Sequence, residues 1–273
     1  MSMSGFPSLP AGKPWLQSVA EGKVLGYSTV DKFGFNPAIA PDTDPETVWE
    51  GGGIYIYSAT ADILSVASND DTDTQDLKVQ GIGADGREVI QTVPLEGNTR
   101  VALLYPLYRV YRMQNEGTTK FAGTVFCYTG TGTVPSVGDA EVRAIIDDGN
   151  NQTLMAVYTV PLGKVGFLHR GEVGCSFTAG PNATEYANVD YRSRRYGKIF
   201  KIKKRISLIT TGASVFQDKR SFPDPIPALT DIEICVQSVS EAMGVWATLD
   251  MLIVDEDQLA PEFLEAIGQP TSL

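Results

Sequence analysis

Short runs in which apolar and polar residues alternate recur along the chain, and turn-forming residues separate them. β-Branched and aromatic residues dominate these runs, which is typical of β-strands. The runs lie at residues 24–30, 54–57, 63–68, 77–83, 88–93, 101–111, 121–128 and 141–146, and then at 154–160, 164–175, 185–191, 199–208, 213–216, 231–239 and 245–254. Strands that recur at intervals of about 8–12 residues predict an all-β sandwich or barrel.

Turn signals refine this prediction. Asp85-Gly86 lies between two alternating runs, and this dipeptide is the strongest short-range hairpin signal. Residues 32–50 contain three prolines and predict a long loop. No amphipathic stretch of helix length separates the strands, so a parallel sheet with crossover helices is not expected. One short helix is predicted near the end, with Pro261 early in it and Gly268 after it.

A run of turn-forming residues, Asp-Asp-Gly-Asn-Asn at 147–151, marks the expected domain boundary. We predict an extended N-terminal arm at 1–20, a β-sandwich domain at 21–148, a second sandwich or jelly-roll-like domain at 149–256, and a tail with the short helix at 257–273. Phe6 and Trp15 are the large apolar residues of the arm and its candidate anchors, and we expect the arm to be either disordered or ordered by a partner.

Composition narrows the function. The chain has 273 residues with 42% hydrophobic content, and its net charge of −11 argues against general nucleic-acid binding. One histidine and three dispersed cysteines encode neither a multi-histidine metal site nor a disulfide framework, and they fit folding in a reducing cytosol. The N-terminus does not resemble a signal peptide, and no apolar run is long enough for a membrane helix. We therefore expect a soluble protein made in a cytosol, with no membrane partner.

Candidate chemistry is sparse. The acidic run at 70–76 offers oxygen ligands for Ca²⁺ but lacks the EF-hand spacing, so a solvated acidic loop is favoured and calcium binding stays open. His169 lies in a strand-like run without a nucleophile motif, which favours a structural or surface role. With 33 acidic residues, a carboxylate pair for glycosidic chemistry is not rejected. We assign no catalytic, metal-binding or cofactor-binding residue and expect no enzymatic activity.

Charge is strongly segregated along the chain. Residues 192–220 contain ten basic residues and one acidic residue, whereas residues 41–90 contain eleven acidic and two basic residues. One interpretation is docking on an acidic partner or on another copy of the chain. Another is a solvated outer strand whose lysines prevent aggregation. Nucleic acid or an anionic glycan is a weaker third alternative. The partner-binding candidates are Phe6, Trp15, Arg192, Arg194, Arg195, Lys198, Lys201 and Lys203.

Three segments resemble virion structural proteins of tailed bacteriophages. Residues 151–164, Asn-Gln-Thr-Leu-Met-Ala-Val-Tyr-Thr-Val-Pro-Leu-Gly-Lys, are similar to a segment that recurs in these proteins. Residues 86–97 and 108–112 are similar to segments that precede it there, with Gln91 where the family tends to have Glu. The resemblance covers residues 50–255 and implies a particle protein without catalytic activity, of the kind that decorates or cements the head or belongs to the neck and tail.

From these observations we expect a capsid decoration (cement) protein. Its partners would be the major capsid protein and other copies of itself, as a homotrimer, on the outer capsid surface of a virion assembled in the host cytoplasm. A tail, neck or baseplate component and a β-domain that binds or hydrolyses host glycans are the alternatives. An exported cellular adhesion module is disfavoured by the missing signal peptide.

Overall fold

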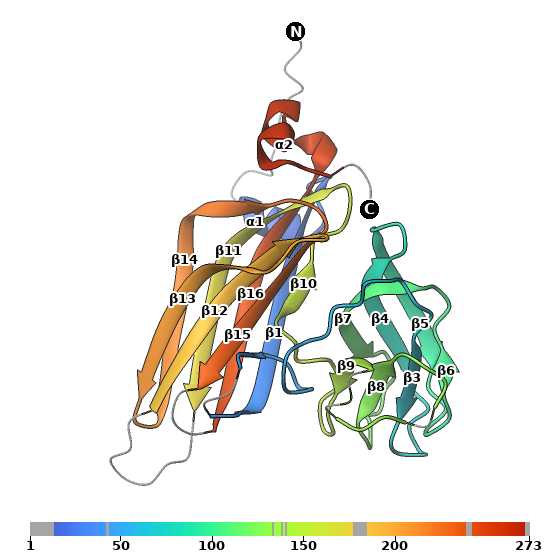
Figure 1. Cartoon of the computed structure of the whole chain (residues 1–273). Coiled ribbons are helices and arrows are strands. Elements are labelled where there is room, and N and C mark those ends of the chain that lie inside the picture. Colours follow the sequence, from blue (N-terminus) through green and yellow to red (C-terminus); the bar gives the residue numbers. More distant parts are fainter. Residues whose placement is uncertain are drawn as a thin grey trace.

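The fold consists almost entirely of antiparallel β-strands, arranged in two bodies (Figure 1). The computed structural model describes residues 14–41, 44–132, 134–137, 139, 141–176, 185–238 and 242–270. Helices in this part of the chain are short: α1 (Trp15–Ala20), α2 (Pro261–Ile267) and the 3-10 turn η1 (Glu256–Gln258). The all-β prediction is confirmed.

The larger body is a sandwich of two sheets. The first sheet has the order β1 (Tyr27–Ile39), β16 (Met243–Asp255), β11 (Lys164–Ser176) and β14 (Ala213–Ile226). The second has the order β10 (Val157–Thr159), β15 (Thr230–Ser238), β12 (Glu185–Arg195) and β13 (Lys201–Thr210). The two-residue strand β2 (Glu46–Thr47) pairs with β15 at the same edge as β10.

Eight of these strands follow a nested pairing scheme. In chain order, the first strand pairs with the eighth (β1 with β16), the second with the seventh (β10 with β15), the third with the sixth (β11 with β14) and the fourth with the fifth (β12 with β13). The first and third pairs lie in one sheet, where the pairing of β11 with β16 joins them. The second and fourth pairs lie in the other sheet, where the pairing of β12 with β15 joins them. This arrangement is an eight-stranded jelly roll, as the sequence predicts.

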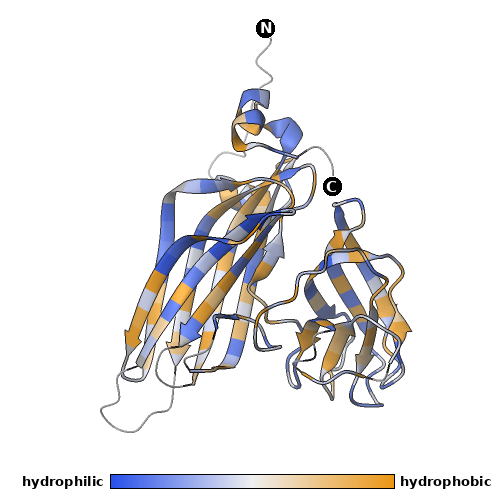
Figure 2. Cartoon of the chain, in the orientation of Figure 1, coloured by the Kyte–Doolittle hydropathy of each residue, from blue (hydrophilic) through white to orange (hydrophobic). Residues whose placement is uncertain are grey.

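The core of the jelly roll follows from strand periodicity. Successive side chains of a strand point to opposite faces, so every second residue enters the sandwich. In β16 the alternate residues from Met243 to Ile253 are buried in the core, and the residues between them are mostly half-buried on the outside. Figure 2 shows hydrophobic and hydrophilic residues alternating along these strands.

The smaller body is inserted between β2 and β10 and has its own core. One of its sheets has the order β6 (Val101–Ala102), β3 (Ser65–Ser68), β8 (Val125–Tyr128) and β9 (Val142–Ile146), and the other has the order β5 (Glu88–Pro94), β4 (Asp76–Gly83) and β7 (Leu107–Asn115). The predicted hairpin at Asp85-Gly86 is confirmed, because β4 pairs with β5 and Gly86 has the positive φ of 79° that such a turn requires.

The predicted division at residues 147–151 differs from the structure at the N-terminal side. The predicted first domain includes residues 21–53, but β1 pairs with β16 and belongs to the jelly roll. The predicted loop at 32–50 is also wrong in its first part, because β1 extends to Ile39. Local pattern does not reveal a pairing between strands that lie more than two hundred residues apart.

Both ends of the described chain pack on the jelly roll. The predicted extended arm is helical at Trp15–Ala20, and the Trp15 ring packs edge-on against Tyr27 with ring centroids 5.4 Å apart. The C-terminal helix is confirmed, with Pro261 in its first turn and Gly268 ending it at a φ of 63°. Residues 1–13, which include Phe6, lie outside the described residues.

The two chain segments that connect the inserted domain to the jelly roll contact each other. Trp49 and Met155 form an isolated antiparallel bridge. The Glu50 carboxylate accepts hydrogen bonds from the side chain of Asn150 at 2.6 Å and from the backbone N–H of Leu154 at 3.0 Å. Burial raises the pKa of Glu50 to about 7, so this carboxylate gains its charge close to neutral pH.

Glu50 predicts a pH-dependent stability. Its pKa in the folded protein lies above the unfolded value of 4.5, so the free energy of unfolding falls as the pH rises from about 4.5 to about 7. The loss is roughly 1–3 kcal/mol. Glu50→Gln imitates the protonated group, and we expect it to remove this part of the pH dependence in urea unfolding measured at pH 5 and pH 8. Glu116→Gln, at an exposed glutamate, is the control; an equal effect of both variants would contradict the assignment.

Candidate partner-binding site

Two of the arginines predicted to bind a partner are neutralised within the chain. Arg192 and Arg194 on β12 lie directly opposite Glu233 and Asp231 on β15. Arg192 approaches Glu233 to 2.6 Å, and Arg194 approaches Asp231 to 2.9 Å. Both carboxylates are almost fully buried. Both arginines therefore have acidic partners within the chain, and their contact with another molecule stays a prediction.

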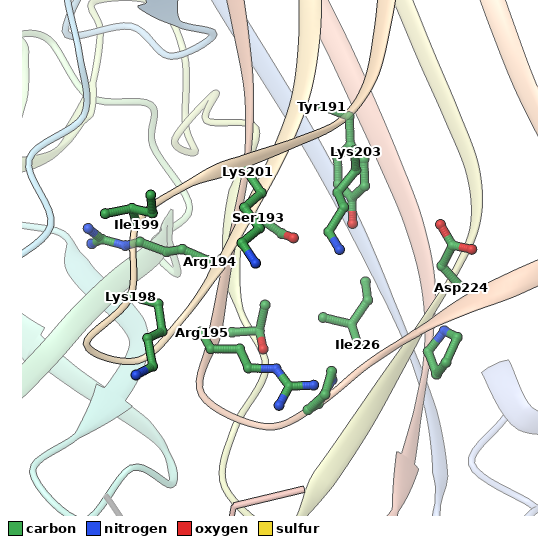
Figure 3. A pocket seen from close by; sticks show the side chains of 13 residues that line it. Tyr191, Ser193, Arg194, Arg195, Lys198, Ile199, Lys201, Lys203, Asp224 and Ile226 are labelled. Carbon is green, nitrogen blue, oxygen red and sulfur yellow. The ribbon is translucent and has the colours of Figure 1, made fainter. Parts of the chain in front are cut away.

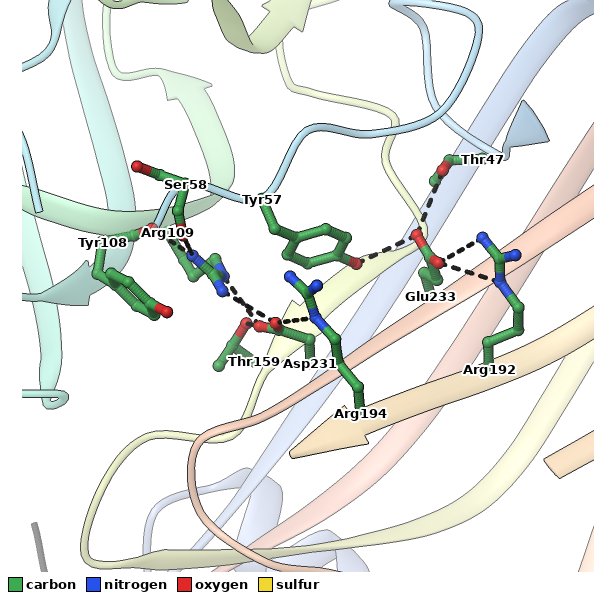
Figure 4. A network of polar contacts seen from close by, with 10 residues as sticks. All are labelled: Thr47, Tyr57, Ser58, Tyr108, Arg109, Thr159, Arg192, Arg194, Asp231 and Glu233. Atoms are coloured by element: carbon green, nitrogen blue, oxygen red, sulfur yellow. Dashed lines mark hydrogen bonds and ion pairs between the residues drawn. The ribbon is translucent and has the colours of Figure 1, made fainter. Parts of the chain in front are cut away.

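The inserted domain completes this charged network (Figure 4). Arg109 on β7 makes a two-pronged ion pair with Asp231, with both nitrogen–oxygen distances 2.9 Å. Asp231 also accepts the hydroxyl of Thr159 at 2.7 Å. One carboxylate is thus shared by two guanidinium groups from different domains. Such an arrangement fixes position strongly, because each buried charge needs its partners.

Tyr57 links the inserted domain to the second carboxylate of the network. Its hydroxyl donates to Glu233 at 3.3 Å, and the Arg194 guanidinium lies 4.5 Å from the centre of its ring. Burial, assisted by the Glu233 and Asp231 carboxylates, holds the pKa of Tyr57 well above its ordinary value. The phenol therefore stays protonated and remains a donor. The centre of the Phe200 ring lies 4.6 Å from the same guanidinium and 5.3 Å from the centre of the Tyr57 ring.

Sequence analysis missed these acidic partners, although the signal was present. Arg192 and Arg194 alternate on one strand, and Asp231 and Glu233 alternate with the same period on another. Complementary alternation of charge is what two adjacent antiparallel strands require. Arg109 and Tyr57 offer no comparable signal, because they come from the inserted domain.

Arg195 binds the end of the C-terminal helix. Its guanidinium donates to the backbone carbonyls of Ile267 and Gly268, at 3.3 Å in the case of Gly268. These carbonyls lie at the C-terminal end of α2, where helical backbone acceptors lack intrahelical partners. Arg195 therefore fastens the C-terminal segment to the jelly roll.

The three predicted lysines differ from the arginines. Lys198, Lys201 and Lys203 are exposed at a cavity of about 490 Å³ at one end of the jelly roll (Figure 3). No ion pair joins them to a carboxylate of the described residues. Asp224, an acidic residue of the cavity lining, is paired with Arg220. The structure thus brings the three lysines together as a basic surface that the described acidic groups leave uncompensated.

A buried hydroxyl belongs to the same cavity. Thr230 is 4% exposed and lines the cavity, and its Oγ1 has no hydrogen-bond partner among the described residues. Leaving a buried hydroxyl without a partner is unfavourable by about 1–3 kcal/mol. Together with the lysines, it makes this cavity the candidate site for an anionic group of a partner.

The remaining candidates have structural surroundings. Trp15 packs on the apolar cluster formed by Val19, Val24, Leu252 and Val254, so its contact lies within the chain. His169 lies at a bulge of β11, where the register shifts between Leu168 and Arg170.

The acidic loop at 70–76 also uses its carboxylates locally. Asp73 accepts hydrogen bonds from Ser68 and from the backbone of Ala122 and Gly123, and Asp70 accepts from Thr72. Within the described ranges, no group of three or more histidine, cysteine, aspartate or glutamate side chains is arranged to hold a metal ion.

Comparisons with known proteins give weak structural similarity. No protein-family model matches the chain, and no curated protein matches it. In a structure of the infectious bursal disease virus Gt strain, the match covers 90% of this chain and 79% of the viral chain, with 11% sequence identity and a TM-score of 0.23. In the crystal structure of the infectious bursal disease virus VP2 subviral particle, the match covers 84% of this chain and 76% of the viral chain, with 10% sequence identity and a TM-score of 0.21. TM-scores this far below 0.5 establish neither a shared fold nor a shared function. Neither described helix is long and apolar enough to cross a membrane.

The shared carboxylate predicts a large stability effect. Asp231→Ala removes the carboxylate that Arg109 and Arg194 share in a buried site, so we expect the free energy of unfolding to fall by about 3–5 kcal/mol. Glu116→Ala removes an exposed ion pair with Lys78 and is expected to change stability by less than about 1 kcal/mol. Urea unfolding of both variants measures the difference, and equal effects would show that the network is not a structural requirement.

Proposed function

We propose that the chain is a structural protein of a virus particle, which acts by binding to the particle and not by catalysis. The observation that carries the proposal is the complete eight-stranded jelly roll with an inserted domain. Jelly rolls occur in viral capsid proteins and in lectins. Because one fold hosts many functions, the site must support the choice.

The charge arrangement supports a binding role. The buried carboxylates between the two domains are paired within the chain: Asp231 binds Arg109 and Arg194, and Glu233 binds Arg192. The exposed lysines at the end of the jelly roll are available to a partner. In a chain of net charge −11, such a basic surface favours docking on an acidic protein surface, because the rest of the chain repels polyanions such as nucleic acid.

In its finer form, the proposal is a decoration protein on the outer capsid of a tailed phage. It would bind the major capsid protein through the cavity of Lys198, Lys201 and Lys203, and it would be present as a homotrimer. A protein that binds only the assembled lattice stabilises it by mass action, and several sites in one oligomer add avidity. The segments that resemble phage virion proteins support this form.

Those segments come together in space. Leu162 donates its N–H to the carbonyl of Gly86 at 2.8 Å, and the rings of Tyr111 and Tyr158 pack edge-on with centroids 5.0 Å apart. The Tyr111 hydroxyl donates to Glu88. The resemblance therefore concerns the junction of the inserted domain with the jelly roll, which suits a scaffold.

A reconstruction of purified particles that encode the chain, at side-chain resolution, tests the proposal. Density for the chain on the outer head, in hundreds of copies, supports the decoration role. A few dozen copies or fewer at the tail, neck or baseplate would replace it by that alternative. Absence of the chain from the particle would overturn the structural role.

The lysines allow a direct binding test. Lys201→Gln with Lys203→Gln removes two charges from the cavity, and we expect co-sedimentation with particles that lack the chain to weaken about tenfold or more at low salt. The matched control, Arg87→Gln with Lys120→Gln, removes two exposed charges from the inserted domain. If the control weakens co-sedimentation as much as the cavity variant, net charge governs binding and the cavity does not. High salt should weaken wild-type binding, because exposed charges are screened.

A further inference from the structure

The outer face of the sheet formed by β1, β16, β11 and β14 lies on the side of the jelly roll away from the sandwich core. Its register places side chains in three rows across the four strands. The first row is Phe35, Trp246, Gly174 and Val215, the second is Phe33, Thr248, Glu172 and Gln217, and the third is Asp31, Asp250, Arg170 and Lys219. We call these three rows the outer face.

The first row and Phe33 make a flat apolar platform. The Trp246 indole lies over Gly174, where an added Cβ would come within 2.4 Å of the ring. The Phe33 ring lies 6.5 Å from the indole, with an angle of 25° between the planes. Phe33 is 38% and Val215 is 60% exposed. Because Gly174 has no side chain, the indole lies against the strand, and Trp246 is half-buried there.

The second row supplies oriented polar groups beside the platform. Glu172 accepts hydrogen bonds from Arg170 at 2.5 Å and from Gln217 at 3.2 Å. These two hydrogen bonds lower the pKa of Glu172, which keeps it ionised at neutral pH. Arg170 Nε is buried without a hydrogen-bond partner among the described residues. The Glu172 carboxylate and the Gln217 amide thus lie side by side next to the platform.

A cavity adjoins the third row. It has a volume of about 470 Å³ and is lined by Leu16, Asp31, His169, Arg170, Asp250 and Leu252, among others. Burial raises the pKa of Asp250, and the nearby Asp31 carboxyl raises it further through charge and a hydrogen bond. Asp31 and Asp250 lie directly opposite each other on adjacent strands, so two carboxyl groups border the cavity. Leu16 and Leu252 add apolar surface.

We propose that the outer face binds a neutral oligosaccharide, with one sugar ring stacked on Trp246 and neighbouring hydroxyl groups bonded by Glu172, Gln217 and the polar third row. A sugar ring has an apolar C–H face and a rim of hydroxyls that both donate and accept. A flat aromatic face next to mixed donors and acceptors complements that chemistry. The adjoining carboxyl groups disfavour a polyanionic ligand.

A second copy of the chain fits this face less well. Two of the three rows are polar or charged, whereas the centres of protein–protein interfaces are depleted in charged residues. The proposed site is also separate from the lysine cavity, which the virion role invokes. A negative result for one of the two proposals therefore does not decide the other.

The test uses the full chain and a panel of neutral oligosaccharides, comprising glucose-, galactose-, mannose- and N-acetylglucosamine-based oligomers, in a glycan array followed by calorimetry. We expect the wild type to bind at least one class. Trp246→Ala should weaken that binding about tenfold or more, and Trp246→Phe should retain part of it. Leu104→Ala, at a residue 64% exposed on the inserted domain, should have no effect. Urea unfolding checks that each variant is folded.

Three results would overturn the proposal: no binding to any member of the panel, binding that Trp246→Ala leaves unchanged, or a change of oligomeric state in sedimentation caused by Trp246→Ala, which would assign the face to a second copy. Loss of glycan binding with unchanged co-sedimentation on virus particles separates this site from the virion role.

Discussion

The arrangement of the molecule depends on one buried carboxylate. Asp231 lies on a central strand of the jelly roll and binds Arg194 from the neighbouring strand and Arg109 from the inserted domain. A charge with so little access to water is tolerated only when its partners surround it. The same contact therefore stabilises the sheet and sets the position of the inserted domain. Lys32 reinforces it from the other sheet: it is buried, its pKa is well below the ordinary value because of burial, and it donates to the carbonyl of Tyr111.

Alternation along the chain predicts most of the strands, the hairpin at Asp85-Gly86 and the C-terminal helix, because each depends on neighbours within a few residues. The strand predicted at residues 54–57 is wrong: this segment is irregular, and Tyr55 donates its N–H to the Thr47 hydroxyl. The domain division was only partly predictable. Residues Tyr27–Ile39 pair with a strand near the opposite end of the chain, and one proline inside this strand and two after it resemble a loop. Strand pairing at such separation depends on complementary faces that no local window contains.

The candidate site shows the same limit. The basic segment was visible in the sequence, but its members have different roles. Arg192 and Arg194 are bound by carboxylates on a strand that lies outside the basic window, Arg195 binds the end of a helix, and the lysines remain exposed. Charge density in a sequence window reports how many cations there are. Which of them are available to a partner depends on the residues across the sheet, and the cross-strand register decides this.

The two sheets of the jelly roll consequently differ in what they offer to other molecules. The outer side of the sheet with β12 and β15 carries alternating charges that the inserted domain covers, so its polar groups are bound within the molecule. The opposite sheet keeps an outer face on which aromatic and polar residues are ordered in rows. The edge strand β1 of that sheet also contacts the inserted domain, because Lys32 donates to the carbonyl of Tyr111. Pairing across four strands sets the order of the outer rows in advance, and a surface ordered in advance loses less conformational entropy when it binds another molecule.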